Sequence, residues 1–170
     1  ISHPHVVSVI DYGESSGLFF MAMTYVDGRS LDAHLKAQKL LPLAHVANIG
    51  FQMGGALAAI DQVGLIHRDI KPANIMIANR DAGAYLTDLG LAKATDNSQD
   101  ITLKGFTVGT PNYIAPEQAL AEDELTIACD MYSLGATLYH AATGSLLFQR
   151  SNAFQVMKAH VREKPIDPRE

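Results

Sequence analysis

Four polar side chains in the middle of the chain could do chemistry together. Asp69, Lys71 and Asn74 place a carboxylate, an ammonium and an amide in one short stretch, and Asp88 adds a second carboxylate after the next apolar runs. Carboxylate and amide oxygens are the ligands that Mg²⁺ prefers, and a lysine can neutralise phosphate charge. These residue types therefore suit one task, which is to hold a metal–polyphosphate beside an attacking hydroxyl group.

The apolar pattern predicts the elements that must position these side chains. Residues 6–10 and 18–26 indicate two strands of an antiparallel hairpin, which Asp27-Gly28-Arg29 ends. In residues 42–63 apolar side chains recur at steps of three and four, so we expect a long core helix that Gly64 stops. Four further helical segments and two short strands are expected at residues 30–39, 75–78, 84–87, 116–120, 127–142 and 151–161. Ser30 or Asp32 could cap the first of these helices.

Composition narrows the class of protein. The 170 residues carry a net charge of −5, so the chain lacks the basic character of a nucleic-acid binder. Its apolar runs fall short of the roughly 18 residues of a membrane span, and we expect no membrane segment. Cys129 has no partner for an internal disulfide and is interpreted as a small buried apolar residue. Because the chain starts at Ile1 without a methionine, we expect a fragment of a longer protein.

The order of the motifs resembles the eukaryotic-type protein kinases, and most closely their bacterial serine/threonine members. Three motifs carry the resemblance: His67-Arg68-Asp69 with Asn74 five residues after the aspartate, Asp88-Leu89-Gly90, and Ala115-Pro116-Glu117. They are similar to the catalytic loop, to the family's usual Asp-Phe-Gly and to the end of the activation segment. The resemblance implies an α+β protein-kinase-like fold, with residues 1–26 as a remnant of the N-lobe and residues 27–170 as a truncated helical C-lobe.

The resemblance also implies a reaction. A serine/threonine protein kinase transfers the γ-phosphoryl group of ATP to hydroxyl groups of protein substrates, with Mg²⁺ as the metal. Asp69 would then accept the proton of the substrate hydroxyl, Asn74 and Asp88 would bind Mg²⁺, and Lys71 would neutralise phosphate charge. A lysine two residues after the aspartate is typical of the serine/threonine members. Thr110 is similar to the family threonine that contacts both the aspartate and this lysine.

The nucleotide-binding positions implied by the resemblance lie on both sides of the catalytic stretch. Met23 falls at the gatekeeper position, and the backbone of Thr24 and Val26 would hydrogen-bond the edge of the adenine. Met76 would pack against the adenine ring, and Asp88 would reach the phosphates through the metal. Each methionine taken alone is more often an ordinary core residue.

Regulation is implied by Arg68, directly before Asp69. In family members with this arginine, a phosphorylated residue of the activation loop pairs with it and orders the loop. Lys93 is similar to a second cation of that pocket, and Thr102 and Thr107 are the candidate phosphorylation sites. Both hydroxyls are also compatible with an ordinary solvated loop. A dimer in which one copy phosphorylates the loop of the other is a further expectation.

Structural roles are implied for four more residues. His67 is expected to pack under Leu89 rather than to act as an acid–base catalyst. Glu117 would form part of the end of the activation segment. Asp130, in the apolar helix 127–142, would hold the backbone of the catalytic loop, because a buried carboxylate is costly without donors.

Other parts of the family pattern are missing from these residues. The Gly-rich loop, the ATP-pairing lysine and its glutamate partner would precede Ile1, so we expect little phosphoryl transfer from this chain alone. Two alternatives stay open: a pseudokinase that binds partners without transfer, and a helical domain with fortuitous motifs. The intact Asp69, Lys71, Asn74 and Asp88 favour the kinase. The cytoplasm is the expected location, and a membrane anchor elsewhere in the parent protein is left open.

Overall fold

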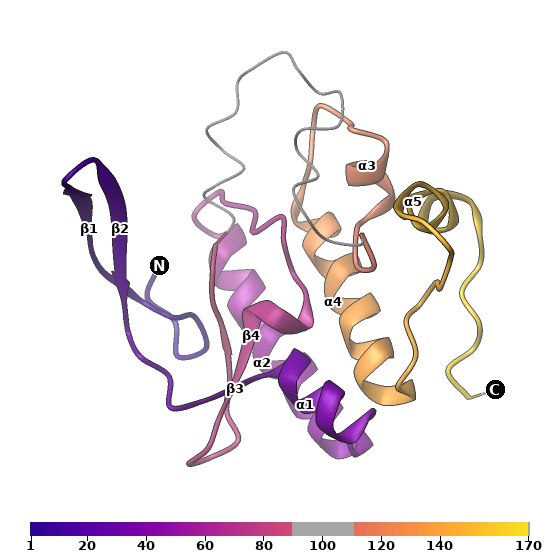
Figure 1. Ribbon diagram of the computed structural model, residues 1–170, viewed down its shortest axis with the longest axis horizontal. Helices are drawn as coiled ribbons and strands as arrows, with labels where there is room; N and C mark the ends of the chain where they lie inside the picture. Colours follow the sequence, from indigo (N-terminus) through magenta and orange to yellow (C-terminus); the bar gives the residue numbers. More distant parts are fainter. Residues whose placement is uncertain (90–110, 170) are drawn as a thin grey trace.

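The computed structural model of the chain describes residues 1–89 and 111–169, and it shows an α+β fold. A hairpin stands to one side of a body of helices, with the N-terminus beside the hairpin and the C-terminus beyond α5 (Figure 1). In chain order the elements are β1 (Val9–Ser15), β2 (Leu18–Met23), β3 (Gly28–Ser30), α1 (Leu31–Gln38), α2 (Leu43–Asp61), the 3-10 helix η1 (Pro72–Asn74), β4 (Ile75–Ala78), β5 (Ala84–Leu86), α3 (Pro116–Ala119), α4 (Ile127–Thr143) and α5 (Ala153–Arg162).

The predicted hairpin is present with different limits. β1 and β2 pair antiparallel, from Val9 opposite Met23 to Ser15 opposite Leu18. The second strand ends at Met23 rather than at residue 26. Nearly all side chains of the hairpin are exposed, including the 86% exposed Phe19. The hairpin therefore presents apolar surface that the described residues leave uncovered.

The prediction that residues 6–10 form a hairpin strand is wrong for its first residues, because β1 begins at Val9. Val6 and Val7 are buried and lie beside β5 rather than in the hairpin. Val6 forms an isolated parallel bridge with Leu86, and the Val7 N–H donates to the Leu86 carbonyl at 2.9 Å. An apolar run indicates that a segment is buried, but it does not specify which strand the segment pairs with.

A second sheet, in the order β3-β4-β5, was predicted only in part. β4 and β5 lie where the sequence indicated strands, but β3 occupies a position that the sequence indicated only as a break. The glycine is required by the pairing, because a Cβ at Gly28 would lie 2.1 Å from the carbonyl oxygen of Ile77. Ser30 ends β3 and caps α1, where its hydroxyl accepts from the Ala33 N–H at 3.2 Å.

The hydrophobic core lies where α2 packs against α4 and β5. Five residues of the predicted helical stripe are buried on α2, together with Ala56: Val46, Ile49, Met53, Leu57 and Ile60. Full burial of one large aliphatic side chain contributes about 1.5–3 kcal/mol, so this stripe is a major source of stability. In the part of the chain that is described, α2 is the one helix long and apolar enough to cross a membrane. Because its stripe lies in the core, we interpret its hydropathy as core packing.

Candidate functional site

The central site forms on the loop between α2 and β4, and this loop is hydrogen-bonded to α4. The backbone N–H groups of His67 and Arg68 donate to the two carboxylate oxygens of Asp130, each at 2.7 Å. Asp130 is only 1% exposed. Burial raises the pKa of its carboxyl, and the two N–H donors act against that rise. The carboxylate therefore fixes the backbone directly before Asp69.

His67 is buried, and both of its ring nitrogens are used inside the protein. Nε2 lies 2.9 Å from the Thr87 carbonyl oxygen, and Nδ1 accepts from the Asp69 N–H at 3.3 Å. Nε2 therefore carries the hydrogen and donates to the carbonyl. The imidazole ties the loop to the segment before Asp88, which is a structural arrangement.

Asp69 is the point at which the predicted catalytic side chains meet. Its Oδ2 accepts from Lys71 Nζ at 2.7 Å and from Asn74 Nδ2 at 3.0 Å. The same Nδ2 also donates to the Asp69 carbonyl oxygen at 2.8 Å. The side chains of Lys71 and Asp69 are 39% and 31% exposed, whereas Asn74 is buried. The carboxylate is thus oriented by two donors and still reaches solvent, where a hydroxyl group can approach.

Asp88 is connected to Asn74 through the neighbouring residue Thr87. The Thr87 N–H donates to the Asn74 carbonyl oxygen at 2.9 Å, and the Thr87 hydroxyl lies 3.2 Å from the same oxygen. The Thr87 hydroxyl also lies 3.2 Å from Asp88 Oδ2. Asn74 and Asp88 are therefore held to one another through a single residue.

Two residues of the site have a left-handed backbone, which is uncommon away from glycine. Arg68 has φ +65° and Asp88 has φ +54°. Such conformations cost on the order of 1–3 kcal/mol each and concentrate at functional sites, where surrounding contacts maintain them. Here the contacts from Asp130 and Thr87 supply that support.

Two residues of the site were missed in the sequence. Thr87 was assigned only to the end of a strand, although it bonds to both halves of the site. Gln118 of α3 donates from Nε2 to the Arg68 carbonyl oxygen at 3.0 Å, while its Oε1 accepts from the Ala115 N–H at 3.1 Å. A single polar residue does not form a spacing pattern. Only its position beside a family motif could have indicated a role for Thr87 or Gln118.

The predicted nucleotide-binding residues lie on β2, on the segment after it and on β4. Met23 is the last residue of β2, and the Thr24 N–H donates to the Ser8 carbonyl oxygen at 2.9 Å. An adenine contact at Thr24 would therefore use its carbonyl group. Val26 is half-buried in the segment between β2 and β3, and Met76 lies on β4, the direct neighbour of β3.

The remaining predicted residues divide into two groups. Leu89 is half-buried against the core. Glu117 lies in the first turn of α3. Burial is the main cause that raises the pKa values of Tyr132 and Cys129, and the charge of Glu117 raises them further. Four predicted residues lie outside the described residues: Lys93, Thr102, Thr107 and Thr110.

The oxygen ligands that the site offers are of the kind that a hard divalent cation binds. Asn74 and Asp88 offer an amide oxygen and a carboxylate, and Mg²⁺ commonly takes few protein ligands together with phosphate and water oxygens. Within residues 1–89 and 111–169, no group of three or more His, Cys, Asp or Glu side chains could hold a metal.

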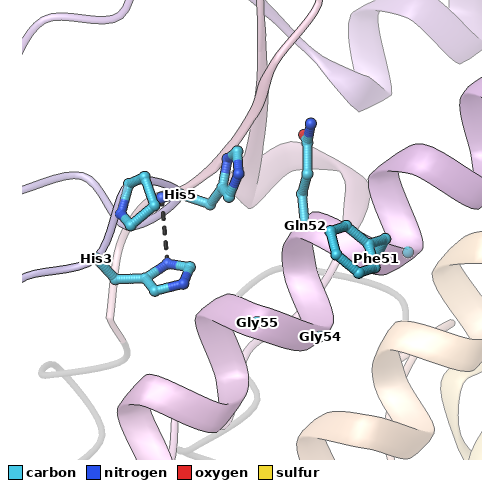
Figure 2. Close-up of a pocket in the computed structure, with 8 residues that line it drawn as sticks. His3, His5, Phe51, Gln52, Gly54 and Gly55 are labelled. Atoms are coloured by element: carbon cyan, nitrogen blue, oxygen red, sulfur yellow. Dashed lines mark hydrogen bonds between the residues drawn. The ribbon is translucent and has the colours of Figure 1, made fainter.

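A pocket of about 560 Å³ lies elsewhere, between the N-terminal segment and α2. His3 and His5 form one side, with the His5 N–H donating to His3 Nδ1 at 3.2 Å (Figure 2). Phe51 and Gln52 on α2 form the other side (Figure 2). No residue of the Asp69 site lines this pocket.

The chain matches known proteins over nearly all of its length. A family model described as "Protein kinase domain" matches residues 1–168. The serine/threonine-protein kinase PknA of Mycobacterium tuberculosis is 39% identical over 170 residues, which is 97% of this chain and 39% of the relative. The serine/threonine-protein kinase pkn3 of Myxococcus xanthus is 37% identical over 175 residues, covering 99% of this chain and 32% of the relative. The chain spans well under half of the length of these relatives.

Solved structures agree with this similarity. The kinase domain of Mycobacterium tuberculosis PknI matches with a TM-score of 0.71 and 32% identity, over 89% of this chain and 55% of that one. Rad53 1–466, solved in complex with AMP-PNP, matches with a TM-score of 0.76 and 30% identity, over 93% of this chain and 38% of that one.

Proposed function

Because the chain belongs to the protein kinase domain family, we propose that the full-length protein transfers the γ-phosphoryl group of ATP to serine or threonine hydroxyls of protein substrates. The observation that supports this most strongly is the convergence of Lys71 and Asn74 on Asp69 Oδ2, at 2.7 and 3.0 Å. Under this proposal residues 1–26 are what the chain holds of the N-lobe, residues 27–170 belong to the C-lobe, and the domain works in the cytoplasm.

Asp69 is the proposed proton acceptor. The two donors on Oδ2 fix the orientation of the carboxylate, and its side chain is exposed enough to meet a substrate hydroxyl. A well-placed general base contributes about 10²–10⁴-fold to the rate. Lys71 has a second task, because an ammonium beside Asp69 can also stabilise negative charge that develops on the transferred phosphoryl group.

Asn74 and Asp88 are the proposed ligands of a magnesium ion that arrives with ATP. Nδ2 of Asn74 faces Asp69, so its Oδ1 faces away from the base and is the oxygen that would bind the metal. When bound, Mg²⁺ would neutralise charge on the phosphates. Thr87 holds both ligands, because its N–H donates to the Asn74 carbonyl oxygen and its hydroxyl can donate to Asp88 Oδ2. Met23, Thr24, Val26 and Met76 are proposed to contact the adenine.

The test is a transfer assay with the full-length protein, γ-labelled ATP and a mixed protein substrate, followed by identification of the labelled amino acid. We expect label on serine or threonine that requires Mg²⁺ and is lost in Lys71→Met. The matched control is Lys158→Met, which removes an exposed lysine from α5. If the wild-type protein binds Mg²⁺–ATP but transfers no label, the proposal fails in favour of a pseudokinase.

A further inference from the structure

The pocket beside the N-terminal segment takes no part in the site around Asp69. Its volume of about 560 Å³ lies in the range of small-molecule sites. His3 and His5 form one wall, and α2 forms the other with Phe51 and Gly54 (Figure 2). It is therefore a separate candidate site, and these side chains define what it can bind.

Hydrogen bonds within the protein fix which ring nitrogen of each histidine carries the hydrogen. Nδ1 of His3 accepts from the His5 N–H at 3.2 Å, so the hydrogen of its neutral ring lies on Nε2. Burial and the neighbouring His5 lower the pKa of His3, so its imidazole is neutral at pH 7. Nδ1 of His5 lies 2.9 Å from the Ala84 carbonyl oxygen, which can only accept. In the neutral ring of His5, Nδ1 therefore carries the hydrogen and Nε2 is an acceptor.

The two Nε2 atoms are available to a ligand. Both rings line the pocket, and neither Nε2 has a hydrogen-bond partner among the described residues. His3 Nε2 lies 3.4 Å from the position that a Cβ on Gly55 would take, so it points toward α2. The ring centroids of His3 and His5 are 5.7 Å apart. Because a hydrogen bond spans about 2.9 Å, one polar group of a ligand can bond to both rings.

The α2 wall leaves room for a flat ligand. Phe51 is exposed, so a face of its ring is available for stacking. Gly54 lies in the middle of α2, where glycine is less favourable than alanine. An added Cβ there would meet no described atom within 4 Å, so packing does not require the glycine, whereas an open pocket does. The described residues that line the pocket include no Lys, Arg, Asp or Glu, which favours an uncharged ligand.

We infer that this pocket binds an uncharged aromatic amide or lactam, whose carbonyl oxygen accepts from His3 Nε2, whose N–H donates to His5 Nε2 and whose ring stacks on Phe51. A metal ion suits the pair less well, because the lone pair of the neutral His3 ring is already used on Nδ1. A phosphorylated ligand would lack a cation, since no Lys or Arg lines the pocket. This inference does not depend on phosphoryl transfer.

The experiment titrates the full-length protein with three related probes by isothermal titration calorimetry. Mg²⁺–AMP-PNP is present throughout, so that the proposed nucleotide site is blocked. Benzamide has both the carbonyl group and the N–H, N,N-dimethylbenzamide lacks the N–H, and benzoate is charged and lacks the N–H. Three variants accompany the wild type. His3→Phe keeps a ring but removes the donor, and Gly54→Leu places a side chain in the pocket. The matched control Gly135→Leu adds one on α4, where a Cβ also meets no described atom within 4 Å.

Benzamide should bind with a dissociation constant of about 1 mM, and the other two probes should bind about tenfold more weakly. His3→Phe should weaken benzamide binding about tenfold, Gly54→Leu should remove it, and Gly135→Leu should bind like wild type. Equal affinity for the three probes, unchanged binding in either pocket variant, or no benzamide binding by the wild type would overturn the inference. A protein that binds benzamide in this pattern but transfers no phosphate would defeat the proposed function alone.

Discussion

Asn74 donates the two hydrogen bonds that bind its side chain to Asp69, at 2.8 Å to the backbone carbonyl oxygen and at 3.0 Å to Oδ2. Asn74 is buried, and its own carbonyl oxygen accepts from Thr87. One residue therefore contributes to the position of the proposed base and links it to the segment that bears Asp88. These two hydrogen bonds lie at the centre of the site, and their contribution to the free energy of unfolding can be measured.

Replacement of Asn74 by aspartate should weaken both the fold and the site. A carboxylate cannot donate to Asp69, and it would place a second negative charge beside Oδ2 in a buried position. We expect unfolding free energy to fall by about 1–3 kcal/mol, measured by urea denaturation. The control is Asn79→Asp, because Asn79 also donates to an aspartate, Asp27, at 3.0 Å, but on an exposed turn. Equal losses in the two variants would contradict the weight given to Asn74.

Asp130→Asn tests the attachment of the loop to α4. An asparagine offers one acceptor oxygen in place of two, so the N–H of His67 or Arg68 would lose its partner. A buried unsatisfied donor costs about 1–3 kcal/mol, so the variant should unfold at lower urea concentration. Amide exchange should also increase at residues 67–69. Asp123→Asn, at an exposed position, serves as the control. Wild-type exchange at residues 67–69 in Asp130→Asn would count against this attachment.

Acidification should destabilise the protein through two histidines. Burial is the main cause that lowers the pKa of His140 and of His160 from 6.5, while Asp32 and the Asn112 backbone respectively act against it. The buried Nε2 of His160 has no hydrogen-bond partner among the described residues, so the lowering of its pKa by burial dominates. Below about pH 6.5 the unfolded chain then binds more protons than the folded chain, and stability falls as the pH falls.

This pH dependence can be measured as the thermal midpoint between pH 7.5 and pH 5. The double variant His140→Gln, His160→Gln should lose less stability over this range than wild type, because neither side chain titrates. The control is His45→Gln at an exposed position of α2, which should keep the wild-type slope. An unchanged slope in the double variant would show that other groups cause the acid loss.

The hairpin should make the chain self-associate when it is studied alone. Its sheet has two strands among the described residues, so each strand has an unpaired edge, and Phe19 on β2 is 86% exposed. Phe19→Asp should weaken self-association about tenfold or more, measured by sedimentation equilibrium. Phe51→Asp is the matched control, because Phe51 is 83% exposed but lies on α2. A monomeric wild-type chain at high concentration would contradict this prediction.

Periodicity predicted the long elements well. The predicted apolar stripe of α2 lies in the core. Ser30, one of the two predicted N-cap candidates, caps α1. The strand errors have a common cause, which is that pairing depends on partners far away in the chain. Val6 and Val7 are apolar enough for the hairpin but pair beside β5, and Gly28 is a strand residue because β4 approaches it closely.

Site prediction had a similar limit. Asp69, Lys71, Asn74 and Asp88 could be selected because their spacing matches a known family. Thr87 and Gln118 form hydrogen bonds that depend on the fold, and no local pattern distinguishes them from other polar residues. The side chains with a chemical role could therefore be identified from the sequence. Those that connect the parts of the site could be identified only from the structure.

The most direct test of the account is Asp69→Asn in the full-length protein. Asparagine keeps the size of the side chain but cannot accept a proton from a substrate hydroxyl. We predict that kcat falls by about 10²–10⁴-fold while the affinity for Mg²⁺–ATP is unchanged, with the exposed Asp61→Asn as the control. A variant that retains the wild-type kcat would contradict the role assigned to Asp69 and the mechanism built on it.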